Sequence, residues 1–181
     1  MDVVELQERV CKALPAPKKH FVLYRTEKEF LRALESDNQF MYGIFDKDKL
    51  IAQSILSFDK EFIDELPQYN FDLRDVAIYK GVLVDPDYRG GIMSRMQGAR
   101  EDMAIMCGKK IALCKISVDN DVSMGNAKKH GMVLLQTARD GSGYVKTYWG
   151  KALEDNMLVM SMKSQMMMAN FARREYLLNN I

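Results

Sequence analysis

The part of this 181-residue chain best suited to chemistry is an apolar strand that ends at a proline and turns through two glycines into a helix. It runs from Val82 to Met96, with Pro86 after the strand and Gly90 and Gly91 in the turn. The first N–H groups of a helix have no intrahelical partner, and the helix dipole adds partial positive charge there. Glycines let the backbone come close to a ligand. The junction therefore predicts a phosphate-binding site.

Histidines and cysteines offer little other chemistry. His20 and His130 are far apart and have no cysteine or carboxylate at ligand spacing, so no metal site is expected. The three cysteines, Cys11, Cys107 and Cys114, are odd in number and lack metal-ligand spacing, which favours reduced thiols in a cytoplasmic protein. Cys114 alternates with apolar neighbours in a predicted strand, so we interpret it as a core residue and not a nucleophile.

Charge and hydropathy exclude two classes of partner. The 26 Lys and Arg residues nearly balance 25 Asp and Glu, so no global basic field favours nucleic acid, and no nucleic-acid partner is expected. No run reaches the roughly 18 apolar residues of a membrane span, so no membrane partner is expected either. The acidic start of the chain, with Asp2, Glu5 and Glu8, does not resemble a signal peptide.

Apolar spacing and turn signals predict alternating helices and strands. In chain order they are a helix at 3–14, a strand at 21–24, a helix opened by a Thr26–Glu29 capping box, a hairpin of 40–45 and 50–58, a central strand at 75–84, a helix at 92–106, a strand at 111–118, a helix at 120–129, and a hairpin of 132–137 and 144–150. A helix separates strands 75–84 and 111–118, which favours their parallel pairing. On helix 92–106 an apolar stripe excludes Arg95 and Arg100. The order predicts an α/β (α+β) fold with a mixed, largely antiparallel central sheet flanked by helices.

From about Phe21 to Leu153, these residues and their order resemble the GNAT superfamily of acyl-CoA-dependent N-acyltransferases. The most specific piece, Val84 to Gly90, is similar to the strand end and arginine-glycine turn that open the superfamily's coenzyme A loop. The resemblance implies that backbone N–H groups hold the pyrophosphate, and that the strand before them pairs with the pantetheine arm. The implied co-substrate is acetyl-CoA or another acyl-CoA. Its expected contacts are Val82, Leu83, Val84, Arg89, Gly90, Gly91, Ile92, Met93, Ser94 and Asn120.

The chain departs from the family pattern at two places. The glycine loop that begins at Arg89 is one residue shorter than in typical members. The tyrosine that often protonates the departing thiolate would lie four residues before Gly131, where this chain has Ala127. The usual general acid is therefore absent.

N-acyl transfer needs a base for the amine, a donor for the carbonyl oxygen and an acid for the thiolate. Asp75 and Tyr79 are candidate bases, as is a water held by strand backbone. A bulge near Leu83–Val84 would direct a backbone N–H to the carbonyl. Ser123 and Asn126 are weak candidates for the acid, which water can replace because a thiolate is a tolerable leaving group.

The resemblance implies a cytoplasmic N-acyltransferase, most simply an acetyltransferase, in which an amine-bearing acceptor attacks the thioester directly in a ternary complex. The alternative is a GNAT-fold binding or interaction module with weak or no catalysis, which Ala127 and the short loop favour. Residues 1–153 form the acyltransferase-like domain. The methionine-rich residues 154–181 predict an additional helix that packs on this domain, makes a homodimer contact or reaches over the acceptor cleft.

Overall fold

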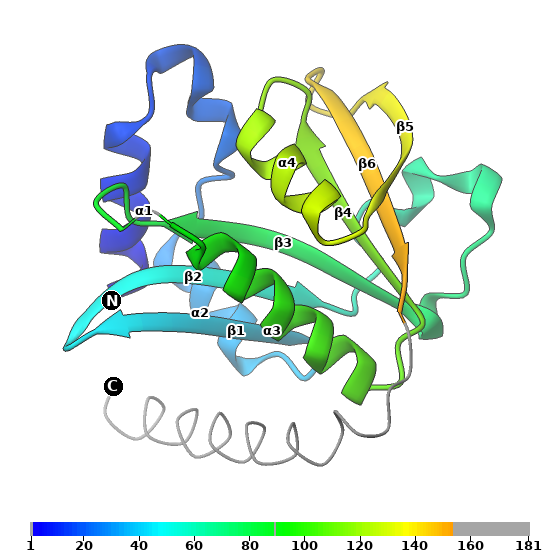
Figure 1. Cartoon of the computed structure of the whole chain (residues 1–181), viewed down its shortest axis with the longest axis horizontal. Helices are drawn as coiled ribbons and strands as arrows, with labels where there is room; N and C mark the ends of the chain where they lie inside the picture. The colour runs from blue at the N-terminus through cyan, green and yellow to red at the C-terminus, as the bar shows by residue number, and fades with distance from the viewer. Residues whose placement is uncertain (1, 89, 154–181) are drawn as a thin grey trace.

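A six-stranded sheet in the order β1-β2-β3-β4-β6-β5 forms the centre of the molecule (Figure 1). The structure is a computed structural model that describes residues 2–88 and 90–153. Its strands are β1 (Gln39–Asp46), β2 (Lys49–Ser57), β3 (Val76–Val84), β4 (Ile111–Ser117), β5 (Val133–Arg139) and β6 (Val145–Ala152). Of the described neighbours only β3 and β4 are parallel, which confirms the predicted mixed, largely antiparallel sheet.

Two of the described α-helices begin after a residue whose side chain caps them. The described α-helices are α1 (Asp2–Ala13), α2 (Glu27–Glu35), α3 (Ile92–Met106) and α4 (Asp121–Lys129), with short 3-10 helices at Ala16–Phe21, Ile63–Glu65, Pro67–Tyr69 and Leu73–Asp75. Thr26 and Glu29 form the predicted capping box, in which the Thr26 N–H donates to the Glu29 carboxylate at 2.7 Å. Asn120 caps α4 by accepting from the Ser123 N–H at 3.1 Å.

Helices α3 and α4 cover one face of the sheet, as Figure 1 shows. The core on this face contains Tyr79 of β3, Met103 and Ala104 of α3, Cys114 of β4 and Ala127 of α4. Burial of these apolar side chains is the main source of stability for the layer.

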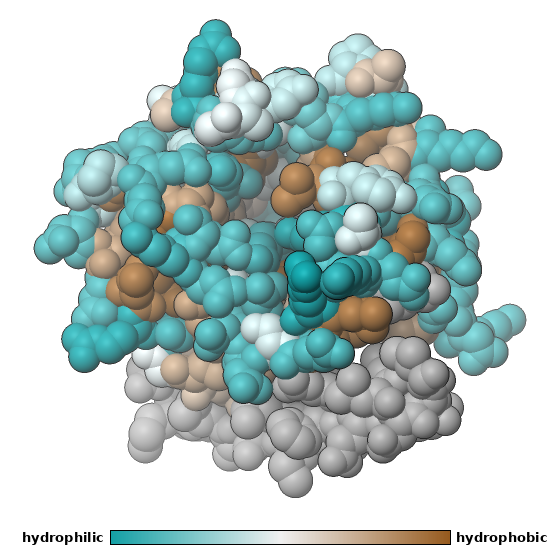
Figure 2. Space-filling model, turned by 180° about the vertical axis from the view of Figure 1, so that it is seen from behind, coloured by the Kyte–Doolittle hydropathy of each residue, from teal (hydrophilic) through white to brown (hydrophobic). Residues whose placement is uncertain are grey.

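The opposite face is covered by three segments from the first half of the chain. Leu6 of α1 and Phe30 of α2 pack with Leu83. Ile63 and Leu66, in the connection between β2 and β3, form a second cluster on this side. Figure 2 shows this side of the molecule as mostly hydrophilic, with scattered hydrophobic patches. The sheet is thus packed on both sides.

The predicted strand at residues 21–24 is wrong. A 3-10 helix occupies Ala16–Phe21, and Leu23 and Tyr24 follow without strand structure, at 73% and 55% exposure. The Gln7 side chain of α1 binds the backbone just after the predicted strand. Its amide donates to the Arg25 carbonyl at 2.8 Å and accepts from the Arg25 N–H at 2.9 Å. A side chain therefore takes the place of a strand partner.

The predicted orientation of Arg100 is also wrong. The sequence places it off the apolar stripe, but the buried face of α3 is formed by Met96, Gln97, Arg100, Met103 and Ala104. The buried face of the helix is thus shifted by about one residue from the predicted apolar stripe, so Arg100 lies between α3 and the sheet. The predicted helix at residues 154–181 lies outside the described residues. Over the part of the chain that is described, no helix is both long and apolar enough to cross a membrane.

Candidate active site

The site begins where β3 and β4 separate. Three successive pairs join them in register, and Ile78 with Leu113 is the last of these pairs. Beyond it, β3 continues to Val84 and β4 to Ser117 without pairing to each other. Figure 1 shows the two strands diverging toward this end of the sheet. Along the gap, each strand therefore has backbone N–H and C=O groups that are not hydrogen-bonded to the other strand.

A bulge interrupts β3 beside the gap. Leu83 pairs with Gln53 and Lys80 with Ile55, so β3 has one more residue than β2 in this interval. Gly81 takes up the excess with φ of +62°, a conformation that favours glycine. The extra residue reverses the alternation of side chains, so that Leu83 joins the α1 and α2 core while Tyr79 faces α3. The predicted bulge is confirmed, but it lies at Gly81–Val82 and not at Leu83–Val84.

The turn after β3 is anchored by a buried carboxylate. Asp85 is 1% exposed and accepts from the Arg9 side chain at 2.9 Å and from Lys49 at 3.0 Å. It also accepts from the Asp87 N–H at 3.1 Å, which closes the turn. Burial raises the pKa of Asp85, but these hydrogen bonds outweigh burial and hold the pKa below its ordinary value. The carboxylate fixes the path of the chain toward α3.

Two glycines join this turn to α3. Gly90 and Gly91 have φ of +96° and +82°, and Gly91 is the N-terminal cap of the helix without any side-chain cap. A Cβ at either position would meet no atom within 4 Å, so the space beside the turn is open. The N–H groups of the first helical turn, near Ile92 and Met93, have no intrahelical partner and adjoin this open space. Arg89 lies outside the described residues.

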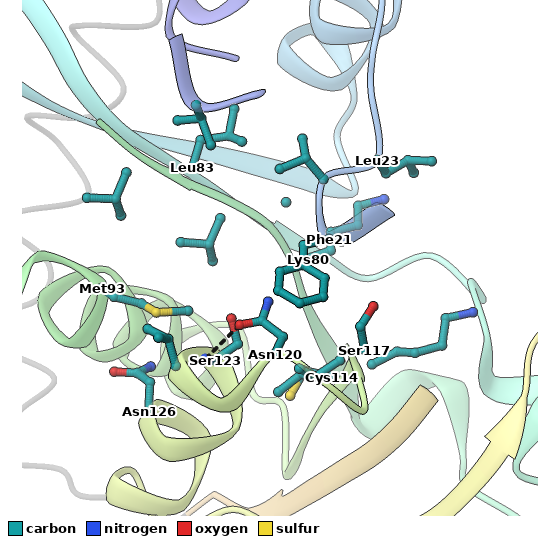
Figure 3. A pocket seen from close by; sticks show the side chains of 18 of the residues that line it. Phe21, Leu23, Lys80, Leu83, Met93, Cys114, Ser117, Asn120, Ser123 and Asn126 are labelled. Carbon is teal, nitrogen blue, oxygen red and sulfur yellow. Dashed lines mark hydrogen bonds between the residues drawn. The ribbon is translucent and has the colours of Figure 1, made fainter. Parts of the chain in front are cut away.

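A cleft of about 1230 Å³ connects the turn with the gap between the strands. Figure 3 shows Met93 of α3, Ser123 and Asn126 of α4, and Phe21 and Leu23 of the N-terminal segment among the residues that line it. All of the predicted coenzyme A contacts in described residues line the cleft, except Ser94. The Ser94 hydroxyl is instead 2.6 Å from His130 Nε2, and burial lowers the pKa of that imidazole.

The three predicted catalytic residues occupy different places. Asp75 lies at the opposite end of β3, where it pairs with Lys110 at 3.1 Å, and it does not line the cleft. Tyr79 lines the cleft, and its hydroxyl is buried without a partner among the described residues. Burial raises the pKa of Tyr79 far above its ordinary value, so the phenol stays protonated and suits a donor better than a base. Ser123 lines the cleft from α4.

Two other residues named from the sequence are core residues. Ala127 is 3% exposed within the apolar cluster under α4, so no hydroxyl stands where the family acid would be. Cys114 is buried, and burial raises the pKa of its thiol to about 12. The thiolate is therefore scarce at neutral pH, which confirms the interpretation of Cys114 as a core residue. In the described part of the chain, no cluster of three histidine, cysteine or acidic residues is arranged to hold a metal ion.

A charged group on the other side of the sheet was not anticipated from the sequence. Glu65 accepts hydrogen bonds from the Tyr148 hydroxyl and from Lys115 at 3.0 Å, and it lines the cleft. Glu61 pairs with Lys80 close by. Both carboxylates come from the connection between β2 and β3, whose alternating acidic and aromatic residues were the available signal. Because the partners of Glu61 and Glu65 are distant in sequence, this pattern did not predict that the two carboxylates lie at the cleft.

Solved structures with this arrangement of helices and strands include GNAT-family acetyltransferases. The GNAT domain of S. lividans PAT matches with a TM-score of 0.65 at 15% identity, over 84% of this chain and 84% of that chain. The ribosomal-protein-S18-alanine N-acetyltransferase from Escherichia coli matches with a TM-score of 0.61 at 16% identity, over 84% of this chain and 86% of that one.

A Salmonella typhimurium structure that contains acetyl-CoA as its cofactor matches with a TM-score of 0.57 at 14% identity, over 86% and 88% of the two chains. Neither the family models nor the curated proteins searched gave a match to the sequence. The chain has the fold of GNAT acetyltransferases, as the residues from Phe21 to Leu153 predicted.

Proposed function

We propose that this protein is an acyl-CoA-dependent N-acyltransferase. The observation that carries the proposal is the continuous cleft from the open Gly90–Gly91 turn to the gap between β3 and β4. The turn offers free N–H groups to a pyrophosphate, and the unpaired edge of Val82–Val84 offers a strand partner to the amides of pantetheine. The residues present therefore fit coenzyme A.

The cleft reaches both faces of the sheet, which suits a reaction of two substrates. Bound acyl-CoA supplies an activated acyl group: the acceptor amine attacks the thioester carbonyl, a C–N bond forms, the C–S bond breaks, coenzyme A leaves as a thiolate and the nitrogen loses a proton. We assign the donor for the carbonyl oxygen to the backbone of Gly81–Val82, which is outside the register with β2 and β4. Among the carboxylates that line the cleft, we assign Glu65 as the group that takes the proton, directly or through water.

A binding module with the same fold is the second candidate. The observation in its favour is Ala127, which leaves the cleft without the phenol that often protonates the thiolate. A thiol has a pKa of about 8.5, so its thiolate can leave and take a proton from water. Release of free thiol from acetyl-CoA in the presence of a panel of amines separates the two candidates, because the binding module releases none.

The placement of the pyrophosphate is tested by a charge at Gly91. Gly91→Asp adds a carboxylate to the open space beside the turn, and Gly91→Asn adds a neutral side chain of the same size. Asparagine and aspartate both tolerate positive φ, so the pair differs mainly in charge. By isothermal titration, Gly91→Asp should bind acetyl-CoA at least ~10-fold more weakly than Gly91→Asn. Equal affinity of the two folded variants would place the pyrophosphate elsewhere.

A further inference from the structure

Arg100 is a cation buried in the wall of the cleft. It is 2% exposed and lines the cleft from α3. Its guanidinium lies 4.9 Å from the centre of the Tyr79 ring, and Nη2 donates to Gln97 Oε1 at 2.5 Å. Its Nε has no hydrogen-bond partner in the described part of the chain. Burial lowers the pKa of Arg100 to about 10, so it remains charged at neutral pH.

The groups around Arg100 do not balance its charge. The groups whose charge acts on the pKa of Arg100 are Tyr42, Tyr79 and Cys114, all neutral at neutral pH because burial raises the pKa of each. Arg100 also helps to lower the pKa of His130, although burial is the larger cause. No described carboxylate forms an ion pair with it, and the hydroxyls of both tyrosines are buried without a partner among the described residues. A buried cation without a counter-ion is costly, and unpaired hydroxyl donors add to the cost. This cluster of donors is complementary to an anion with two acceptor oxygens.

The cluster lies where the acyl end of the donor would arrive. A pantetheine arm that enters at the turn and follows Val82–Val84 runs toward the Ile78–Leu113 pair, where the gap closes. Tyr79 is the next residue of β3 after that pair, and it is three residues, or about 10 Å, before Val82. Side chains of a helix tilt toward its N-terminus, which directs Arg100 of α3 back toward the opening of the gap.

We propose that Arg100 and Tyr79 bind a carboxylate at the far end of the acyl group, so that the preferred donor is a short dicarboxylic acyl-CoA such as succinyl-CoA. The inference rests on the proposed function, because it assumes that coenzyme A occupies the cleft. The carboxylate takes no part in the bond changes of the transfer. It replaces the missing counter-ion of Arg100 and sets donor specificity.

The test compares acyl groups that differ in the carboxylate. Isothermal titration of the full chain at pH 7.5 uses succinyl-CoA, butyryl-CoA with the same four-carbon chain, acetyl-CoA and coenzyme A. The wild type should bind succinyl-CoA at least tenfold more tightly than butyryl-CoA. Equal or weaker binding of succinyl-CoA, with coenzyme A still bound, overturns the inference and leaves the proposed function standing. Failure of all four ligands to bind overturns the proposed function itself.

Substitutions test whether Arg100 causes the preference for succinyl-CoA over butyryl-CoA. Arg100→Met removes the charge and keeps an apolar side chain of similar length, so the preference for succinyl-CoA should be lost while coenzyme A affinity is kept. Arg95→Met on the exposed side of the same helix is the matched control and should keep the wild-type preference. Tyr79→Phe should weaken succinyl-CoA severalfold and leave butyryl-CoA unchanged.

The melting temperature of the free protein separates recognition from a structural role. Because Arg100→Met replaces an uncompensated buried charge with an apolar group, it should raise the melting temperature. A lower melting temperature, together with equal loss of affinity for all four ligands, would show that Arg100 serves the core and would overturn the inference.

Discussion

Glu65, which lines the cleft, is the residue proposed to take the proton from the acceptor amine. Its carboxylate is held by Lys115 and by the Tyr148 hydroxyl, while the Gln136 side chain binds its carbonyl at 2.8 Å. The two bases expected from the sequence are less suitable in this structure. Tyr79 is kept protonated by burial, and Asp75 is paired with Lys110 away from the cleft.

Glu65→Gln tests this assignment. The amide keeps the size of the side chain but cannot accept a proton, so kcat/KM for the amine should fall by at least about a hundredfold. Acetyl-CoA affinity, measured by titration, should be unchanged. Glu101→Gln is the control, because Glu101 is also an ion-paired carboxylate, with Lys151 at 2.6 Å, but lies outside the cleft. Wild-type kinetics in a stable Glu65→Gln protein would exclude Glu65 as the base.

At the scale of elements, the bulge in β3 links packing to chemistry. Because of the bulge, Leu83 packs in the core with α1 and α2, whereas Tyr79 packs on the face covered by α3. The bulge also leaves the backbone of Gly81–Val82 outside the register with β2. A Cβ on Gly81 would lie 2.6 Å from Arg25 Nη1, at a φ that other L residues adopt with strain. The element therefore depends on glycine at this position.

Gly81→Ala and Gly98→Ala should change stability in opposite directions. Gly81→Ala should lower the free energy of unfolding by about 1–2 kcal/mol because of its positive φ. Gly98 lies inside α3, where an added Cβ would meet no atom within 4 Å, so alanine there should raise the free energy by about 0.5–1 kcal/mol. Urea unfolding measures both. Gly81→Ala should also reduce kcat, and a variant as stable and active as the wild type would contradict the role of the bulge.

At the scale of the whole molecule, Asp85 joins three segments that are distant in sequence. Its carboxylate binds Arg9 of α1, Lys49 of β2 and the N–H of Asp87 in the turn before α3. Because folding lowers the pKa of Asp85, the folded state binds fewer protons than the unfolded state in acid. Its stabilisation is fully present above the unfolded pKa of about 3.9 and is lost as the pH falls through the lower folded value.

Asp85→Asn should therefore lower stability at pH 7 by about 1–2 kcal/mol, a modest value because solvent screens the partly exposed Arg9 and Lys49. The difference from the wild type should shrink as the pH falls below 4. Urea unfolding at pH 7 and pH 3 measures it. Asp64→Asn is the control, since Asp64 is 68% exposed in its pair with Lys60 and should change little at either pH. A constant difference across this range would show that the charge of Asp85 is not what stabilises the turn.

Features governed by neighbours in sequence could be predicted without the structure. The capping box at Thr26, the hairpins, and the strand, glycine turn and helix from Val82 to Met106 each depend on local backbone preferences and apolar spacing. The sequence by itself thus determined the order of the main helices and strands from Thr26 onward, the fold and the position of the turn proposed to bind pyrophosphate.

The tertiary structure alone decided where strand pairing stops and which side chains meet in the gap. The one-residue bulge at Gly81 depends on register with β2, and the burial of Arg100 depends on the rotation of α3 against the sheet. Glu65 meets Tyr148 across 83 positions of sequence. Register, rotation and long-range contact are set by packing between elements, which local spacing does not encode.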